Sequence, residues 1–131
     1  KTRTGEEVCL KCIPKAATDA GGLVQMQEEL RLSNFAQSPS ILRMHEIFQD
    51  MVNVYMVADA LYGGDFTTLV KRATQSGVQT TEDWWRNIFM QCLNALARIH
   101  EKAIMHCDIK EPNWMLRTKN LARPEVVLID L

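Results

Sequence analysis

The first half of the chain alternates short apolar runs with one longer periodic segment, a pattern that predicts strands around a single helix. The runs are rich in apolar and β-branched side chains and are bounded by turn residues, which is typical of strands. The longer segment places Met26, Leu30 and Ser33 on one face at helical spacing and ends before Pro39. We expect strands over residues 7–13, 41–48 and 52–58 and a helix over residues 23–36.

The second half is predicted to be mainly helical. A short helix should follow the Gly63-Gly64 break over residues 65–72, and a long helix should begin near Thr80. Thr80 and Asp83 fit a capping box, in which the two side chains satisfy free backbone N–H groups. The apolar face of the long helix is expected to hold Trp85, Ile88, Phe89, Cys92, Leu93, Leu96 and Ile99. Two short strands should follow, over residues 114–117 and 126–129.

This order of elements predicts an α+β fold made of two lobes. The strands and one helix come first, and the helices with a small hairpin come second. No internal repeat or low-complexity tract interrupts the pattern. We therefore expect a small β-rich lobe followed by a mainly helical one.

The composition narrows the class of protein further. The 131 residues are 47% hydrophobic and 24% charged with a net charge of -1, which is ordinary for a globular protein. This charge gives no reason to expect nucleic acid or an acidic membrane surface as a partner. No apolar run is long enough to span a bilayer, and no signal peptide opens the chain, so we expect a cytoplasmic protein.

The chain has four cysteines, of which Cys9 and Cys12 form a CxxC pair. Such a pair is found in zinc and redox sites, but here it stands alone inside an apolar strand. We therefore expect reduced and mostly buried thiols, as in an intracellular protein.

The strongest candidates for catalytic residues lie near the C-terminal end of the chain. The loop His106-Cys107-Asp108-Ile109-Lys110-Glu111-Pro112-Asn113 is followed, after an apolar run, by Asp130. Phosphoryl transfer needs a carboxylate to orient the attacking hydroxyl, a cation near the moving phosphate, and oxygen ligands for magnesium. Asp108, Lys110, Asn113 and Asp130 together supply these groups. A polar loop closed by an Asx-turn is the simpler interpretation of the same residues.

The chain resembles the protein kinase family, whose catalytic loop has the pattern H-R-D-L-x-x-x-N and whose metal-binding segment begins with Asp. The resemblance implies that Asp108 and Lys110 are catalytic and that Asn113 and Asp130 hold Mg²⁺. Val8-Cys9-Leu10-Lys11 is similar to the V-A-I-K strand, which implies that Lys11 binds the ATP phosphates and pairs with Glu29, or failing that with Glu28. The other ATP-binding residues implied by the resemblance are Cys9, Ala58, Asp59, Leu61, Asp65 and Met115.

The resemblance also implies a division of the chain and a substrate class. Residues 1–58 would form part of the N-lobe, 59–64 the hinge, and 65–131 part of the C-lobe, with the remaining kinase segments outside the chain. Ala58 would occupy the gatekeeper position beside the adenine, where the family usually has a larger side chain. Lys110 is typical of kinases that act on serine or threonine hydroxyls of protein substrates. Residues 63–65 and 126–131 are most similar to the same segments of the calcium/calmodulin-dependent and calcium-dependent kinases.

Some positions depart from the family pattern, and they keep alternative functions open. Cys107 replaces the arginine that pairs with an activation-loop phosphate, Leu131 replaces a Phe, and Ser33 replaces an apolar helix residue. One alternative is a pseudokinase, which would bind or scaffold without transferring phosphate. Another is a small-molecule kinase on the same fold, although such kinases usually lack Lys110 and the V-A-I-K context.

Overall fold

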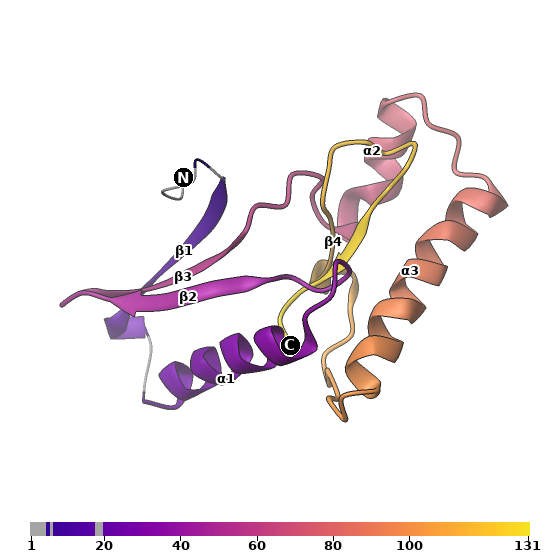
Figure 1. The fold of residues 1–131 in the computed structure, drawn as a ribbon. Helices are drawn as coiled ribbons and strands as arrows, with labels where there is room; N and C mark the ends of the chain where they lie inside the picture. Colours follow the sequence, from indigo (N-terminus) through magenta and orange to yellow (C-terminus); the bar gives the residue numbers. More distant parts are fainter. Residues whose placement is uncertain (1–4, 6, 18–19) are drawn as a thin grey trace.

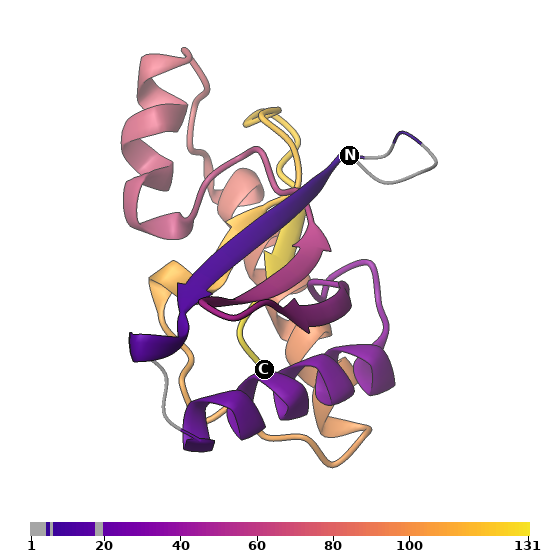
Figure 2. The same cartoon turned by 90° about the vertical axis from the view of Figure 1, so that its left-hand side faces the viewer.

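The first part of the chain is an antiparallel sheet with one helix on its face. The computed structural model describes residues 5, 7–17 and 20–131. Strands β1 (Val8–Pro14), β2 (Met44–Gln49) and β3 (Asn53–Asp59) form a three-stranded sheet in the order β1-β3-β2. A single 3-10 turn, η1 (Lys15–Ala17), follows β1. Helix α1 (Ala20–Ala36) lies along one face of this sheet, as both views of the ribbon show (Figures 1 and 2).

The second part consists of helices around a two-stranded hairpin, which confirms the predicted α+β fold. Its elements are η2 (Phe66–Thr68), α2 (Leu69–Gln75), α3 (Glu82–His100), η3 (Glu111–Asn113), β4 (Trp114–Leu116) and β5 (Val126–Leu128). Strands β4 and β5 pair antiparallel, with Met115 opposite Val127. Figure 1 shows this hairpin between α3 and the first part of the chain. The hairpin therefore borders both parts.

One hydrophobic core joins the two parts. The backbone of Leu42 donates to Leu128 at 2.8 Å, and Leu128 in turn donates to Ser40 at 2.9 Å. Ile41, which follows α1, is only 2% exposed and packs in the same cluster as Leu128 and Ile99 of α3. This packing fixes the first sheet over the hairpin, which is the arrangement that forms the cavity described below.

The buried face of α3 differs from the predicted one. Trp84, Ile88, Cys92, Ala95 and Ile99 are buried. Phe89 and Leu93, expected on the apolar face, are 60% and 59% exposed. The hairpin strand β5 packs on the helix along the stripe of Ile88 and Ile99. The position of β5 therefore decides which face of α3 is buried. The face predicted from the periodic pattern alone was rotated toward Phe89.

The start of α3 is also one residue later than predicted. Thr81, not Thr80, is the N-cap residue, and its hydroxyl accepts from the Trp84 N–H at 3.3 Å. The predicted capping box is wrong because Trp84 occupies the position from which a carboxylate would reach back. Asp83 instead forms a surface ion pair with Arg86.

The other predicted elements are present with small shifts of their ends. The expected helix over residues 65–72 is divided into η2 and α2, because Asp65 caps the short 3-10 turn through the Thr67 N–H at 3.1 Å. Among the residues that the structure describes, no helix is long and apolar enough to cross a membrane.

The thiols are free, but the expectation that most are buried is wrong. Cys9, Cys12 and Cys107 are exposed, and Cys92 alone of the four is buried. Burial raises the pKa of the Cys92 thiol to about 11. Cys9 is exposed because it faces an open cavity rather than a packed core.

Candidate functional site

A cavity of about 400 Å³ opens between the first sheet and the β4–β5 hairpin. Residues from β1, α1, β2, β3, the segment after β3 and the hairpin border it. They are Cys9, Lys11, Glu29, Leu42, Met44, Met56, Ala58, Asp59, Ala60, Leu61, Met115, Ile129 and Asp130. Every residue that the sequence proposed for nucleotide binding, except Asp65, lies in this lining. The fold thus brings together positions that are far apart in the sequence.

The strand register explains why these side chains meet. Successive side chains of a strand point to opposite faces, so Cys9 and Lys11 share one face of β1. Their partners on β3 are Ala58 and Met56, which face the same cavity. Met115 of β4 borders the cavity from the hairpin. The cavity therefore has the sheet on one side and the hairpin on the other.

Glu29 lies in the cavity with both an acidic and a basic neighbour. Burial raises the pKa of its carboxyl group, the nearby charge of Asp130 raises it further, and the charge of Lys11 lowers it. Within the described residues, Lys11 and Glu29 are electrostatic neighbours without a direct ion pair. Glu28, the alternative partner, is turned to solvent and binds Arg31 through a 2.8 Å hydrogen bond. The geometry thus favours Glu29 over Glu28 as the partner of Lys11.

The loop before β4 holds Asp108 between a cation and an amide. Lys110 Nζ lies 2.6 Å from Asp108 Oδ2. The side-chain amide of Asn113 donates to the Asp108 backbone carbonyl at 2.9 Å and to Oδ2 at 3.3 Å. The hydrogen bond from Lys110 is the main cause that lowers the pKa of Asp108. Asp108 is therefore an ionised, exposed carboxylate whose orientation is fixed by its neighbours.

Hydrogen bonds tie this loop to the segment that carries Asp130. His106, which is only 8% exposed, places Nε2 at 2.9 Å from the carbonyl oxygen of Ile129. The Ile129 N–H donates to the Asn113 carbonyl at 3.0 Å. Asp130 itself has φ of 57°, a left-handed conformation that is uncommon for a residue with a side chain. Such strained residues persist where the surrounding contacts fix them, and they gather at functional sites.

The donor set near Asp130 fits magnesium. Mg²⁺ is usually held by one or two carboxylate or amide oxygens together with phosphate oxygens of the substrate. The Asn113 side-chain amide nitrogen is engaged by Asp108, which leaves its oxygen free to bind a cation near Asp130. No group of three or more His, Cys, Asp or Glu side chains in the described part of the chain has the arrangement of a metal site.

Asp65 is the one proposed nucleotide residue that the cavity does not include. Its side chain caps η2, and its backbone pairs with Met115 through an isolated bridge. Asp65 is therefore a neighbour of Met115, which lines the cavity, but Asp65 itself does not line it.

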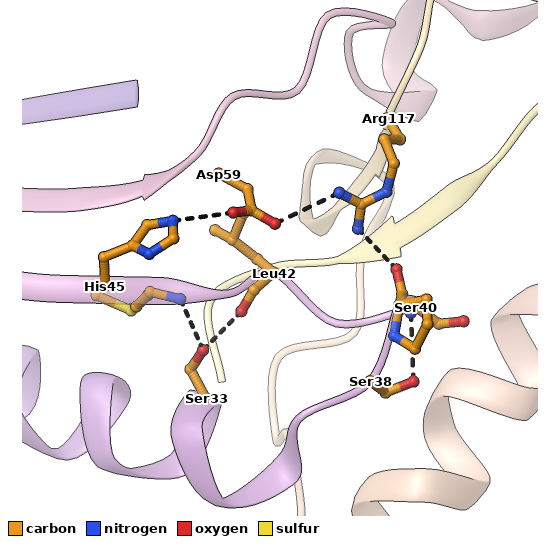
Figure 3. Close-up of polar contacts among 9 residues, drawn as sticks. Ser33, Ser38, Ser40, Leu42, His45, Asp59 and Arg117 are labelled. Atoms are coloured by element: carbon orange, nitrogen blue, oxygen red, sulfur yellow. Dashed lines mark hydrogen bonds and ion pairs between the residues drawn. The ribbon is translucent and has the colours of Figure 1, made fainter. Parts of the chain in front are cut away.

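Two polar clusters lie next to the cavity, and neither was predicted from the sequence (Figure 3). In one, the Ser33 hydroxyl of α1 binds backbone groups of Leu42 and Met44. In the other, the Asp59 carboxylate lies between His45 and Arg117. Both join residues from separate elements, and no local motif marks such contacts.

Comparisons with known proteins agree with this geometry. The family model described as "Protein kinase domain" matches residues 1–131. A protein named "CBL-interacting serine/threonine-protein kinase 17" from Arabidopsis thaliana is 31% identical over 119 residues, which cover 90% of this chain and 27% of the relative. A "CDPK-related protein kinase" from Daucus carota is 30% identical over 118 residues, covering 88% of this chain and 19% of the relative. The chain thus spans about a fifth to a quarter of the length of these relatives.

Proposed function

The chain belongs to the protein kinase domain family, and we propose that the full-length protein transfers the terminal phosphoryl group of ATP to serine or threonine hydroxyls of protein substrates. The observation that carries this proposal is the fixed Asp108 carboxylate, held by Lys110 and Asn113 and tied through His106 to the segment of Asp130.

Asp108 orients the substrate hydroxyl and accepts its proton as the oxygen attacks. Its lowered pKa keeps the carboxylate ionised at neutral pH, so it is ready to accept a hydrogen bond from the hydroxyl. Lys110, 2.6 Å from Asp108, places a positive charge where the negative charge of the moving phosphoryl group develops. Catalysis of this kind is mainly positioning and electrostatic stabilisation.

The cavity above this loop binds the nucleotide. Cys9 and Met115 enclose the adenine from opposite sides, and the backbone of Asp59 and Leu61 meets its polar edge. Lys11 contacts the phosphates, and the charge of Glu29 lies close enough to attract that of Lys11 within the same cavity. Asn113 and Asp130 would hold magnesium, which neutralises phosphate charge when it is bound.

Two observations support transfer to protein hydroxyls over the alternatives. Lys110 is present and contacts Asp108, whereas small-molecule kinases of this fold usually lack it. The similar proteins are named as serine/threonine-protein or CDPK-related kinases. A pseudokinase would be expected to lose one or more of Asp108, Asn113 and Asp130, and all three are here.

Substitution of Asp108 tests the proposal in the full-length protein. Asp108→Asn should lower kcat for a generic Ser/Thr peptide by a factor of about 10³ or more and leave Mg-ATP binding in place, because the group acts on the hydroxyl rather than on the nucleotide. Asp130→Asn should abolish the Mg-dependent turnover. Asp83→Asn, at an exposed carboxylate on α3, is the matched control and should leave both unchanged.

The possible outcomes separate the competing functions. Full activity in Asp108→Asn would show that another group accepts the proton. Binding of Mg-ATP by the parent protein without transfer to any hydroxyl would favour the scaffold function. Transfer to a small molecule but to no peptide would favour the small-molecule kinase.

A further inference from the structure

The segment of residues 59–64, called here the connecting segment, joins the first sheet to the helical part and is anchored firmly at its far end. The Tyr62 N–H donates to the Arg117 carbonyl at 3.1 Å, and the Gly63 N–H donates to the Leu116 carbonyl at 2.9 Å. A Cβ atom on Gly63 would lie 2.2 Å from the Thr118 carbonyl oxygen. This close approach requires glycine, and it presses the end of the segment onto β4.

At the near end of the segment, the Asp59 N–H donates to the Arg43 carbonyl at 3.0 Å and Asp59 pairs with Val8 of β1. Side-chain contacts add to this backbone attachment (Figure 3). The Asp59 carboxylate has His45 Nε2 at 2.9 Å on one side and Arg117 Nη1 at 3.4 Å on the other. Arg117 also donates from Nη2 to the Pro39 carbonyl at 2.8 Å. A single arginine after β4 therefore contacts the segment at Asp59 and Tyr62 and the loop between α1 and β2.

Few side chains pack against the Asp59 end of the connecting segment. A second cavity, of about 450 Å³, lies on the side of Asp59 that faces away from the nucleotide cavity. Its lining includes Gln37, Pro39, Arg43, Asp59 and Arg117. Because a cavity borders the segment here, side-chain packing adds little to the hydrogen bonds and ion pairs that hold Asp59.

We propose that Arg117 is a positioning residue of the nucleotide site. Its guanidinium binds the Asp59 carboxylate and the Pro39 carbonyl, and so adds a side-chain restraint to the near end of the segment, whose Asp59 and Leu61 border the nucleotide cavity. Arg117 does not itself line that cavity. The expected effect of Arg117 on ATP binding rests on the proposed function. Its expected effect on the mobility of the connecting segment does not.

The expected size of the effect is moderate. The side chains of Arg117 and Asp59 are 30% and 28% exposed, so solvent screens their attraction. The hydrogen bond to the Pro39 carbonyl is an additional, charge-assisted contact. A free segment must become ordered when nucleotide binds, and that ordering weakens affinity. Loss of Arg117 should therefore raise the Kd for Mg-ATP by about three- to tenfold.

Hydrogen exchange and nucleotide binding, measured on the full-length protein, test the inference together. In Arg117→Ala without nucleotide, the amides of residues 59–62 should exchange about three- to tenfold faster, since the guanidinium contacts with Asp59 and Pro39 are lost while the backbone hydrogen bonds remain. The Kd and KM for ATP should rise about three- to tenfold while kcat changes less than about twofold. Arg117→Lys should restore part of both effects because one ammonium can replace one of the two contacts. Arg123→Ala, at an exposed arginine of the same β4–β5 loop, is the matched control and should change neither.

Hydrogen exchange and ATP binding together distinguish a failure of this inference from a failure of the proposed function. Unchanged exchange in a folded Arg117→Ala protein would overturn the inference, as would faster exchange with an unaltered Kd for ATP. A parent protein that binds no ATP would defeat the proposed function alone, and the exchange rates would still decide whether Arg117 restrains the segment.

Discussion

The Ser33 hydroxyl donates a 2.6 Å hydrogen bond to the backbone carbonyl of Leu42, across the interface between α1 and the start of β2. The same hydroxyl accepts a 3.0 Å hydrogen bond from the Met44 N–H. Ser33 is only 3% exposed, so both backbone groups depend on it rather than on water. A serine that would leave a gap in an apolar interface instead attaches the helix to the strand, one turn from Glu29.

Ser33→Ala should destabilise the protein by about 1–3 kcal/mol, because it leaves the Leu42 carbonyl and the Met44 amide buried without a partner. The free energy of unfolding from denaturant titration of the full-length protein measures this. Ser76→Ala, at an exposed serine after α2, is the control and should cost less than about 0.5 kcal/mol. An equal, small loss in both variants would show that the α1–β2 interface does not need the hydroxyl.

Local patterns predicted the elements well, and the reason is physical. The strand over residues 8–14 lies in a short apolar run, and α3 has apolar residues at helical spacing, so the local sequence favours each element. The errors lie where tertiary packing decides: β5 selects which face of α3 is buried, and the chain entering α3 makes Thr81 the cap. Periodicity cannot rank neighbouring faces or caps that differ by one residue.

The site was predictable to the extent that its residues follow a spaced motif. Asp108, Asn113 and Asp130 were proposed from their order and spacing and from the family resemblance. The structure brings their segments together, although their roles stay a prediction. The contacts of Arg117 with Asp59 were not identifiable, since they join residues 58 positions apart. Contacts of this kind depend on the final placement of β4 against the connecting segment, which no local pattern records.

Glu29→Gln should stabilise the protein near neutral pH although it weakens ATP binding. Burial and the charge of Asp130 raise the pKa of Glu29 above its unfolded value, so the folded state favours the protonated form. The protonated Glu29 carboxyl therefore contributes its full stabilisation at pH values below the pKa of Glu29 in the unfolded state. This contribution is lost as the pH rises through the higher pKa of Glu29 in the folded state. Glutamine carries no charge, so the variant avoids this loss at neutral pH.

Thermal unfolding as a function of pH measures the difference. The gain in Tm of Glu29→Gln should be present near pH 7 and vanish below about pH 4, where the parent carboxyl is protonated in both states. Glu28→Gln is the matched control: Arg31 lowers the pKa of this exposed carboxylate, so its loss should give no gain. A gain for Glu29→Gln that is the same at all pH values would rule out ionisation as its cause.

Phosphatase treatment of the full-length protein should leave most of its kinase activity. Cys107 stands where an arginine would pair with an activation-loop phosphate, and its exposed thiol contacts only the Met105 carbonyl, at 3.5 Å, among the described residues. An uncharged thiol cannot form that charge-assisted pair. Peptide phosphorylation before and after treatment measures the effect, with more than half of the activity expected to remain. Cys107→Arg should make activity more dependent on the phosphate, and Cys107→Ser should not.

A large loss in the treated parent, recovered on rephosphorylation, would show that another cation binds the phosphate. The Cys107→Ser result would then separate a role of sulfur from a role of charge.

Ala58 lines the cavity with only a methyl group, and we expect this small side chain to leave room behind the nucleotide. Ala58 lies on β3 opposite both Cys9 of β1 and Met44 of β2, and all three line the cavity with Met56. An adenine analogue that carries a bulky aromatic group should reach this space. Burial of about 100 Å² of apolar surface at ~25 cal/mol per Å² would favour the complex by roughly 2.5 kcal/mol before ordering costs.

Ala58→Met should remove that advantage, because the longer side chain would occupy the space beside Met44 and Met56. In the full-length protein, the ratio of analogue affinity to ATP affinity should fall at least about tenfold in the variant, as measured by competition binding. Ala73→Gly, at a buried alanine of α2 away from the cavity, controls for a general loss of stability and should leave the ratio unchanged. An equal ratio in the parent and in Ala58→Met would mean that a flexible methionine already fills the space, and that Ala58 does not determine which nucleotide analogues bind.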